Sequence, residues 1–341
     1  MTTPEPAPAT PPPGEAQPEF LARTFAGWRS QRGMLADVHR TGSFARAIAA
    51  VVAPGMTVAD VGCGSGILSL LAARAGAARV HALEATRMIE DAAEVARANG
   101  FDGDRIEFVS GDARHFVAPG GVDAVIGEWI GMYLFEEWRH FDAFAAVRDR
   151  CLRAGGIVMP RRVRLYLAPI DDSRLYVERG PGFWERPVWG FDFGLVHRRQ
   201  LDRTRRIIVR ADHRTVLDSY RILDLDCATA DSRAYAFVHE AQTRLPHAAS
   251  CHGMLGWFEL DLAPGIVLST SPQSIDTCWH QSYFPFEQLQ LQAGDVLRTR
   301  VETTPDAETG TPVVGLQLEQ RRGEAIVATR AHRYTLHDTQ G

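Results

Sequence analysis

The chain contains no lysine: all 37 of its basic residues are arginine, in a sequence of 341 residues. Because Ala, Gly (30 residues) and Pro (19 residues) are also abundant, a GC-rich coding sequence explains this bias better than selection for arginine chemistry. Concentrated positive charge is missing too, since the formal net charge is −5. Affinity for phosphate backbones needs such charge, so a general nucleic-acid binder is excluded. A basic or guanidino-bearing substrate becomes the better expectation.

Two further absences narrow the class of protein. The five cysteines are odd in number, widely spaced and form no C-x-x-C pair, which argues against a disulfide framework and against a zinc or other metal site. No apolar run approaches the roughly 18 residues that a membrane span needs. Residues 1–18 carry seven prolines and lack the basic start and apolar stretch of a signal peptide, so they predict a disordered tail and a cytoplasmic location.

The region from residue 19 to about 160 has the alternating pattern of a doubly wound α/β domain. A helical segment is predicted over 20–52, with Gly42 as its clearest interruption. Short β-branched runs then alternate with alanine-rich helical runs, which is typical of a parallel sheet. The predicted strands are 57–61, 79–84, 105–110 and 122–127, and the predicted helices are 67–75, 86–99 and 137–153.

After residue 160 the pattern changes to alternating strands and predicts an antiparallel β-barrel or sandwich over 161–341. The predicted strands are 164–169, 221–226, 235–240, 254–262, 265–269, 278–284, 296–301, 313–319 and 325–330. The segment 183–214 interrupts them with four aromatic residues followed by an arginine-rich helical stretch. It is therefore interpreted as an insertion.

A glycine-rich turn between the first strand and the next helix predicts a nucleotide-type cofactor. Asp60 is followed by Gly62, Gly64 and Gly66 in the spacing G-x-G-x-G, and such a turn brings backbone close to a ligand at a helix N-terminus. A dinucleotide fingerprint would need glycine where Ile67 stands, so S-adenosylmethionine fits better. Glu84 ends the next strand and is expected to accept hydrogen bonds from the ribose hydroxyls of the cofactor. Asp112 follows the third strand and is expected to accept from the adenine amine. The competing interpretation of each acid alone is a capped turn or a solvated carboxylate.

Carboxylates also flank an apolar, aromatic loop after the fourth strand. Glu128 precedes this loop, and Glu136 and Glu137 follow it. Two converging carboxylates suit a planar guanidinium, which offers N–H donors along two edges. Apolar neighbours, among them Trp129, Met132 and Tyr133, are expected to bury the loop and form part of the substrate pocket, and buried carboxylates need partners.

Together these motifs resemble the protein arginine methyltransferases over about residues 20–335. The most specific part is the loop from Gly127 to Glu137, which reads Glu-Trp-x-Gly-x-x-Leu-x-x-Glu from Glu128. The resemblance implies a Rossmann-like S-adenosylmethionine domain followed by a β-barrel that carries a dimerisation arm, and hence a homodimer. It makes Glu128 and Glu137 the catalytic clamp on the substrate guanidinium. It assigns Glu84 to the cofactor ribose, and Met34 and Arg40 to a helix over the cofactor, where Arg40 pairs with the methionine carboxylate.

The chain departs from the family pattern in three places. Thr277-Cys278-Trp279 stands where the family has Thr-His-Trp, so the histidine expected to pair with Asp37 is absent, although Trp279 keeps its place at the pocket. The aromatic lid at residues 21–25 keeps one ring. Arg139 follows the clamp and offers a partner for a substrate carboxylate. The acceptor therefore stays open between a protein arginine and free L-arginine or another guanidino metabolite, and the alternative to an enzyme is an inactive scaffold that binds S-adenosylmethionine.

Overall fold

The computed structural model describes residues 27–131, 133, 138–201, 203, 205–207, 214–215, 219–305 and 312–335. Five features named from the sequence lie outside these residues: the tail at 1–18, the lid at 21–25, Met132, Glu136 and Glu137. For Arg139 the structure describes the backbone in helix α6 and not the side chain.

Two N-terminal helices, α2 (Trp28–Ala36) and α3 (Val38–Val51), precede the first sheet. The sequence interpretation placed the break in this segment at Gly42, and this is wrong, because Gly42 lies inside α3. The break is at Asp37, whose backbone is extended (φ −73°, ψ 91°) and whose side chain accepts a hydrogen bond from the backbone N–H of Arg40. Aspartate is a strong N-cap residue, so one side chain ends α2 and starts α3.

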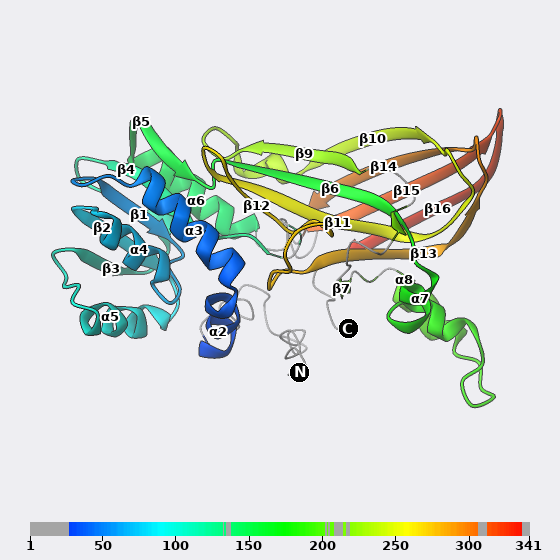
Figure 1. Ribbon diagram of the computed structural model, residues 1–341, viewed down its shortest axis with the longest axis horizontal. Coiled ribbons are helices and arrows are strands. Elements are labelled where there is room, and N and C mark those ends of the chain that lie inside the picture. Colours follow the sequence, from blue (N-terminus) through cyan, green and yellow to red (C-terminus); the bar gives the residue numbers. More distant parts are fainter. Residues whose placement is uncertain are drawn as a thin grey trace.

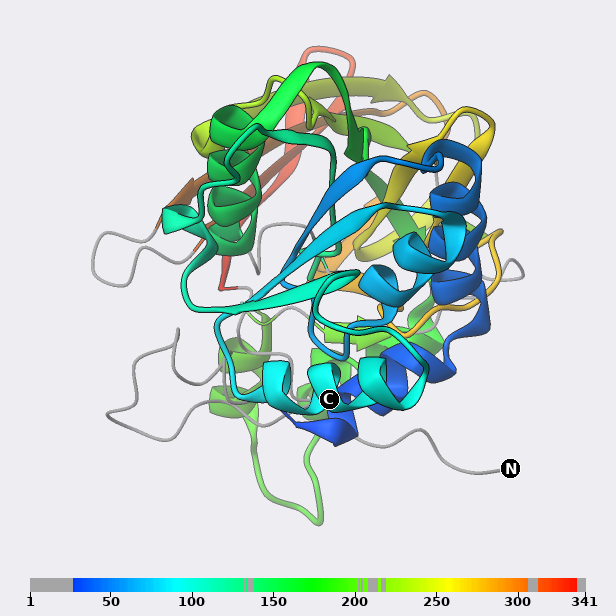
Figure 2. The same cartoon turned by 90° about the vertical axis from the view of Figure 1, so that its left-hand side faces the viewer.

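The first domain is a five-stranded parallel sheet in the order β3-β2-β1-β4-β5. Its strands are β1 (Thr57–Val61), β2 (Arg79–Glu84), β3 (Ile106–Ser110), β4 (Val122–Gly127) and β5 (Leu152–Met159), and its helices are α4 (Ile67–Ala75), α5 (Met88–Ala98) and α6 (Trp138–Cys151). Figure 2 shows α6 on the opposite side of this sheet from α3 and α4. In the register of β1, Val61 pairs with Leu83 of β2 and Gly127 of β4, so the carboxyl ends of these strands lie side by side.

Most of this domain matches the sequence prediction, with one difference at its end. The predicted helix to residue 153 ends at Cys151, and the chain continues directly into β5, which was not predicted. Gly155 has φ 74°, and a Cβ on Gly156 would lie 2.5 Å from the Leu152 side chain. These glycines allow the tight bend within β5, and they also removed the β-branched pattern that marks a strand.

The second part of the chain is antiparallel and forms two sheets. One has the order β7-β13-β11-β6-β8, with β12 paired to β11 and β9 to β6, and the other has the order β10-β14-β15-β16. Figure 1 shows them as one elongated body beside the parallel sheet. The longer strands are β6 (Arg162–Asp171), β9 (Tyr220–Asp226), β10 (Phe237–Arg244), β11 (Ala249–Ala263), β12 (Ile266–Ser269), β13 (Gln281–Leu291), β14 (Val296–Pro305), β15 (Pro312–Arg322) and β16 (Ala325–Thr335), and the two short ones are β7 (Arg205–Ile207) and β8 (Arg214–Thr215).

The predicted insertion follows β6 and projects from the far end of this body (Figure 1). It begins before the predicted residue 183, because α7 (Ser173–Glu178) and a 3₁₀ helix (Pro181–Glu185) follow β6 directly, and α8 (Gly194–Leu201) lies within the predicted range 183–214. Trp189 is 95% exposed and Phe191 70% exposed, at the tip between the 3₁₀ helix and α8. Such large exposed rings are unusual on a monomer surface.

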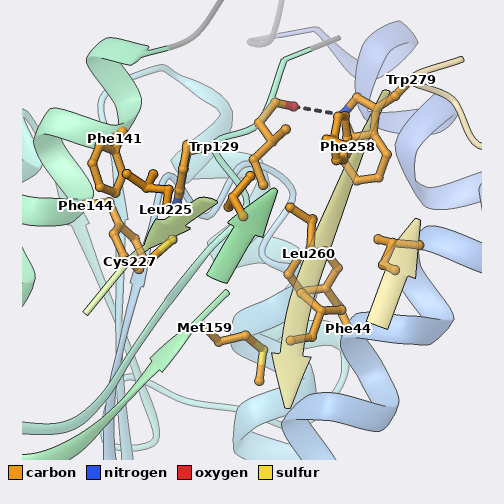
Figure 3. Close-up of a cluster of buried hydrophobic side chains, with 14 of the residues drawn as sticks. Phe44, Trp129, Phe141, Phe144, Met159, Leu225, Cys227, Phe258, Leu260 and Trp279 are labelled. Atoms are coloured by element: carbon orange, nitrogen blue, oxygen red, sulfur yellow. Dashed lines mark hydrogen bonds between the residues drawn. The ribbon is translucent and has the colours of Figure 1, made fainter. Parts of the chain in front are cut away.

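One hydrophobic core connects the two parts of the protein. It contains Phe44 of α3, Met159 of β5 and Leu260 of β11, which lie close together in Figure 3. Burying a large apolar side chain of this kind stabilises a fold by about 1.5–3 kcal/mol. The core therefore fixes α3 against the antiparallel sheet, and with it the residues at the start of α3. In the part of the chain that the structure describes, no helix is long and apolar enough to cross a membrane.

Candidate active site

The glycine-rich turn between β1 and α4 has the backbone conformation that its sequence predicted. Gly62, Gly64 and Gly66 all have positive φ, at 74°, 52° and 78°. The turn is anchored on β2, because the N–H groups of Gly62 and Cys63 both donate to the carbonyl of Leu83 at 2.9 Å. Positive φ is costly for any residue with a Cβ, so these positions favour glycine.

Two acids support this turn from different sides. Glu84, at the end of β2, accepts from the N–H of Gly64 at 3.0 Å and from the N–H of Thr86 at 2.8 Å. Asp60 is fully buried below the turn and accepts from the Ser69 hydroxyl at 2.6 Å, while its Oδ1 has no hydrogen-bond partner among the described residues. Burial raises the pKa of Asp60 from 3.8 to about 7, and the Ser69 hydrogen bond only partly offsets this. Asp60 therefore orients the turn and α4, and the prediction that it is a cofactor-binding residue of the glycine-rich motif stays a prediction.

Gln31 is a residue of this site that the sequence interpretation missed. It is 5% exposed, and its Oε1 accepts from the N–H of Ser65 at 3.2 Å. Its amide lies against the glycine turn, since a Cβ on Gly64 would be 2.9 Å from Gln31 Nε2. The only available signal was its spacing of three residues from Met34, which puts both on one face of α2.

Glu128 follows β4 at the same edge of the sheet. Gly127 permits this approach, because a Cβ there would lie 2.9 Å from the carbonyl oxygen of Val61 and 3.1 Å from the Phe144 ring. The side chain of Glu128 is 10% exposed, and its Oε1 accepts from the N–H of Ile130 at 2.9 Å. Its other oxygen, Oε2, forms an ion pair with Nη2 of Arg40 in α3. The predicted clamp acid is therefore already engaged by a guanidinium.

Arg40 is buried on all sides by groups from three segments of the chain. Its backbone N–H is held by Asp37, and its guanidinium carbon lies 5.3 Å from the centre of the Trp279 ring, in cation–π range. Met34 Sδ is 3.6 Å from Nη2. Burial alone lowers the pKa of Arg40, but the carboxylates of Glu128 and Asp37 raise it above its ordinary value, so the side chain stays charged.

The loop that carries Cys278 reaches the same place from the second domain. The backbone N–H of Cys278 donates to Asp37 Oδ2 at 2.7 Å, and Trp279 Nε1 donates to the carbonyl of Ile130 at 2.8 Å (Figure 3). Burial raises the pKa of the Cys278 thiol to about 12, so it stays protonated at neutral pH. Asp37 thus has a partner at position 278 although the family histidine is absent.

Two predicted pocket residues lie in the core. Trp129 is 3% exposed with its ring centre 4.6 Å from that of Phe141, and Tyr133 is 1% exposed with its ring centre 5.1 Å from that of Phe284 (Figure 3 for Trp129). Both rings support the loop after Glu128 from within the protein. Their place in the substrate pocket stays a prediction, as does that of Trp279, which is 5% exposed beside Arg40.

Asp112 lies after β3, as predicted, and its carboxylate forms an ion pair with the nearby Arg114. Its carboxylate accepts from the N–H and the guanidinium of Arg114, which lowers the pKa of Asp112 below its ordinary value. Its role as an adenine ligand stays a prediction. The structure thus brings Asp37, Arg40, Glu84 and Glu128 together with the glycine turn at one edge of the sheet.

Both parts of the chain match models of known protein families. Residues 58–156 match the family model of a methyltransferase domain, and residues 161–312 match that of an arginine methyltransferase oligomerization subdomain. Protein arginine N-methyltransferase 1 of Schizosaccharomyces pombe is 31% identical over 301 residues, which cover 84% of this chain and 85% of the relative. The protein of the same name from Chlamydomonas reinhardtii is 27% identical and covers 93% of this chain and 94% of its own length.

Solved structures give the same result for the fold. A Trypanosoma brucei PRMT1 enzyme–prozyme heterotetrameric complex with AdoHcy matches with a TM-score of 0.81 and 25% identity, over 91% of this chain and 99% of that one. Arabidopsis thaliana protein arginine methyltransferase 10, in an open conformation, matches with a TM-score of 0.78 and 26% identity, over 92% of this chain and 99% of that one.

Proposed function

This chain belongs to the protein arginine methyltransferase family and is an S-adenosylmethionine-dependent N-methyltransferase of guanidinium nitrogen, and we propose that its acceptor is an arginine side chain within a protein. The relatives that match over most of the chain carry this acceptor in their names. The free-arginine alternative rested on Arg139, on the reduced lid at residues 21–25 and on Cys278 in place of the family histidine. The Arg139 side chain and the lid lie outside what the structure describes, and no contact in the described residues favours this alternative.

The observation that carries the proposal is the ion pair between Arg40 and Glu128. A buried glutamate at the carboxyl end of a parallel strand already binds a guanidinium, with its second oxygen held by the Ile130 N–H. That backbone bond holds Oε1 and leaves Oε2 to bind the guanidinium of Arg40. This ion pair supports the proposal that Glu128 binds a substrate guanidinium.

The residues at the glycine turn fit S-adenosylmethionine. Arg40 Nε is buried without a hydrogen-bond partner among the described residues, so this cation can take a further oxygen ligand such as the cofactor's α-carboxylate. Glu84 is proposed to hold the ribose, and a Cβ on Gly62 would have no atom within 4 Å, so this part of the turn is open to a ligand. When bound, this cofactor supplies an electrophilic methyl group on a sulfonium.

The protein's own part in the reaction is mainly to position the acceptor. Glu128 is proposed to hold one edge of the guanidinium and Glu137 the other, so that a terminal nitrogen faces the methyl group. Holding reactants in attack geometry contributes roughly 7–11 kcal/mol. A guanidinium pKa above about 12 makes prior deprotonation unfavourable, so the proton leaves with or after transfer, and Glu137 is proposed to accept it.

We also propose that two copies of the chain associate through the arm. The match to an oligomerization subdomain and the exposed Trp189 and Phe191 at the tip support this. An apolar patch of two large rings is costly in water and favours burial against a second surface.

Transfer of label from S-adenosylmethionine tests the acceptor. The purified chain is incubated with an arginine-rich peptide, the same peptide with lysine in place of arginine, free L-arginine and agmatine. We expect label only in the arginine peptide. Label in free L-arginine alone would instead establish a small-molecule acceptor, and label in none of the four would support the inactive scaffold.

A further inference from the structure

Helix α2 contacts three other elements of the protein with one of its faces. Trp28, Gln31 and Met34 follow one another at intervals of three residues, so their side chains lie on the same face of the helix. Trp28 Nε1 donates to Asp91 Oδ2 of α5 at 2.7 Å, and Gln31 Oε1 accepts from a backbone N–H of the glycine-rich turn. Met34 Sδ lies 3.6 Å from Nη2 of Arg40 in α3. The helix therefore runs from α3 across the turn to α5, and Figure 2 shows α2 in dark blue beside α5 in cyan.

Apolar packing contributes little to the position of α2. No residue of α2 belongs to the hydrophobic core that the described residues form, and the buried residue of α2 is the polar Gln31. Asp37, whose backbone is extended, separates α2 from α3, and α3 is fixed in the core by Phe44. A short helix that is joined to the core at one end and held by polar contacts can pivot about its junction. The polar contacts of α2 therefore decide how firmly it covers the turn.

The hydrogen bond of Trp28 acts at the end of α2 that is far from this junction. At a rise of about 1.5 Å per residue, Trp28 is about 13 Å along the helix from Asp37. Its bond to the Asp91 carboxylate is short, at 2.7 Å, whereas the Gln31 contact with the turn is 3.2 Å long. Because a bond far from a pivot restrains rotation more than one close to it, the bond between Trp28 and Asp91 is the strongest restraint on opening.

We propose that Trp28 and Asp91 form a latch that holds α2 closed over the cofactor, so that their hydrogen bond sets how fast the cofactor enters and leaves. This rests on the proposed function, because it takes the glycine-rich turn and Arg40 as the place where S-adenosylmethionine binds. Both latch residues are positioning residues, since their bond joins two segments of the protein. It therefore stabilises the closed position equally with and without a cofactor. Closure slows entry and release by the same factor and leaves the affinity nearly unchanged.

The rates of nucleoside exchange test the latch in the intact protein. Surface plasmon resonance gives the association and dissociation rate constants of S-adenosylhomocysteine. Trp28→Phe keeps an aromatic ring and loses the N–H, and Asp91→Ala loses the acceptor. Each variant should raise both rate constants by about 3- to 10-fold, the worth of one hydrogen bond, and change the affinity by less than about 2-fold. Asp91→Asn keeps an oxygen acceptor and should retain most of the slow exchange. An unchanged dissociation rate in Trp28→Phe would overturn the proposal.

A double variant and a neighbouring acid are the controls. Trp28→Phe combined with Asp91→Ala should release S-adenosylhomocysteine no faster than either single variant, because both changes remove the same bond. Glu90 is an exposed acid beside Asp91 in the first turn of α5, and it forms no hydrogen bond to α2. Glu90→Ala removes the same charge from the start of the helix, so both rates should stay unchanged. Additive effects in the double variant, or equally fast release in Glu90→Ala, would overturn the latch.

Hydrogen exchange of backbone amides tests the latch without any ligand. In Trp28→Phe and Asp91→Ala the amides of α2 should exchange faster by about 3- to 10-fold, while those of α3 keep their protection. Equal acceleration in both helices would show that the variants are destabilised as a whole and would overturn the latch. A protein that does not bind S-adenosylhomocysteine contradicts the proposed cofactor site, and hydrogen exchange then still decides whether Trp28 holds α2. Binding with the same rates in the unaltered protein and in Trp28→Phe removes the latch alone.

Discussion

Replacing Asp60 by asparagine should change how the stability of the protein depends on pH. Asp60 lies at the end of β1 with no exposed surface, and its one side-chain partner is the Ser69 hydroxyl. Burial raises its pKa from 3.8 to about 7. The folded state therefore holds a proton on Asp60 at pH values where the unfolded chain has released it.

The direction of the effect follows from proton binding in the two states. Stability rises with pH where the unfolded state binds more protons, and here the folded state binds more. The carboxyl group of Asp60 thus makes folding less favourable as pH rises from 3.8 through 7. Each pKa unit is worth about 1.4 kcal/mol, so the loss between pH 5 and pH 8 is roughly 2–3 kcal/mol.

Asparagine removes this titration and keeps an oxygen that can accept from Ser69. The amide N–H₂ of asparagine takes the position of Oδ1 of Asp60, which has no hydrogen-bond partner among the described residues. This buried, unpaired donor lowers the stability of the folded state by about 1–3 kcal/mol at every pH. We therefore expect Asp60→Asn to be less stable than the unaltered protein at pH 5 and to gain roughly 2–3 kcal/mol relative to it by pH 8. The quantity to compare is the change, between pH 5 and pH 8, in the stability difference between the two proteins. The other titrating groups are common to both proteins and cancel in this difference.

Urea unfolding, followed by circular dichroism at pH values from 5 to 8, measures the difference in stability between Asp60→Asn and the unaltered protein. Asp112→Asn is the matched control, because Arg114 lowers the pKa of Asp112, so its titration ends below this window. Its stability difference from the unaltered protein should be constant from pH 5 to pH 8. Parallel curves for Asp60→Asn would show that Asp60 ionises normally in the fold and would refute the reasoning.

Three further outcomes are expected. Glu128→Gln or Glu137→Gln should lower turnover by at least about 100-fold without weakening S-adenosylhomocysteine, and near-normal turnover in both would exclude the clamp. Glu84→Ala should weaken S-adenosylhomocysteine by roughly 10- to 150-fold in calorimetry, and an unchanged affinity would remove Glu84 from the site. Trp189→Ser should shift a dimer towards monomer in sedimentation, while a monomeric unaltered chain at micromolar concentration would contradict the arm's role.

The parallel sheet was predicted well because its strands are buried on both faces. Continuous apolar runs with turn residues at each end define β1, β2 and β4 to the residue. The glycine turn, Glu84 and Glu128 follow the carboxyl ends of β1, β2 and β4, which meet at one edge of the sheet. Correct prediction of these strands was therefore enough to predict that the three motifs lie close together. In the antiparallel part the predicted strands were mostly too short, since β11, β13 and β16 continue past the apolar runs that identified them.

The contacts that give the site its chemistry could not be predicted. Arg40 and Glu128 are 88 residues apart, and Asp37 and Cys278 are 241 apart. Each meets its partner because α3 packs against α4 of the first domain and against β11 and β12 of the antiparallel sheet, which is a consequence of tertiary packing and leaves no local pattern. Local signals were also misleading at Gly42, where a helix in good packing tolerates a glycine that costs about 1 kcal/mol.

The missing histidine at position 278 shows why a motif can be altered while its function survives. Asp37 needs a donor to hold its carboxylate between α3 and the second domain, and here the donor is the backbone N–H of Cys278 at 2.7 Å. The Cys278 thiol also interacts with Asp37, but S–H is a weak donor, and the backbone donor does not depend on side-chain identity. Cys278→Ala should therefore keep nearly full turnover, whereas Asp37→Ala removes both the backbone bond and the cap on Arg40. Loss of such a cap costs about 1 kcal/mol and releases the segment that carries Arg40, so turnover and S-adenosylhomocysteine affinity should fall together. If Cys278→Ala were as damaging as Asp37→Ala, the thiol itself would be required, and the backbone bond would not explain how this chain dispenses with the histidine.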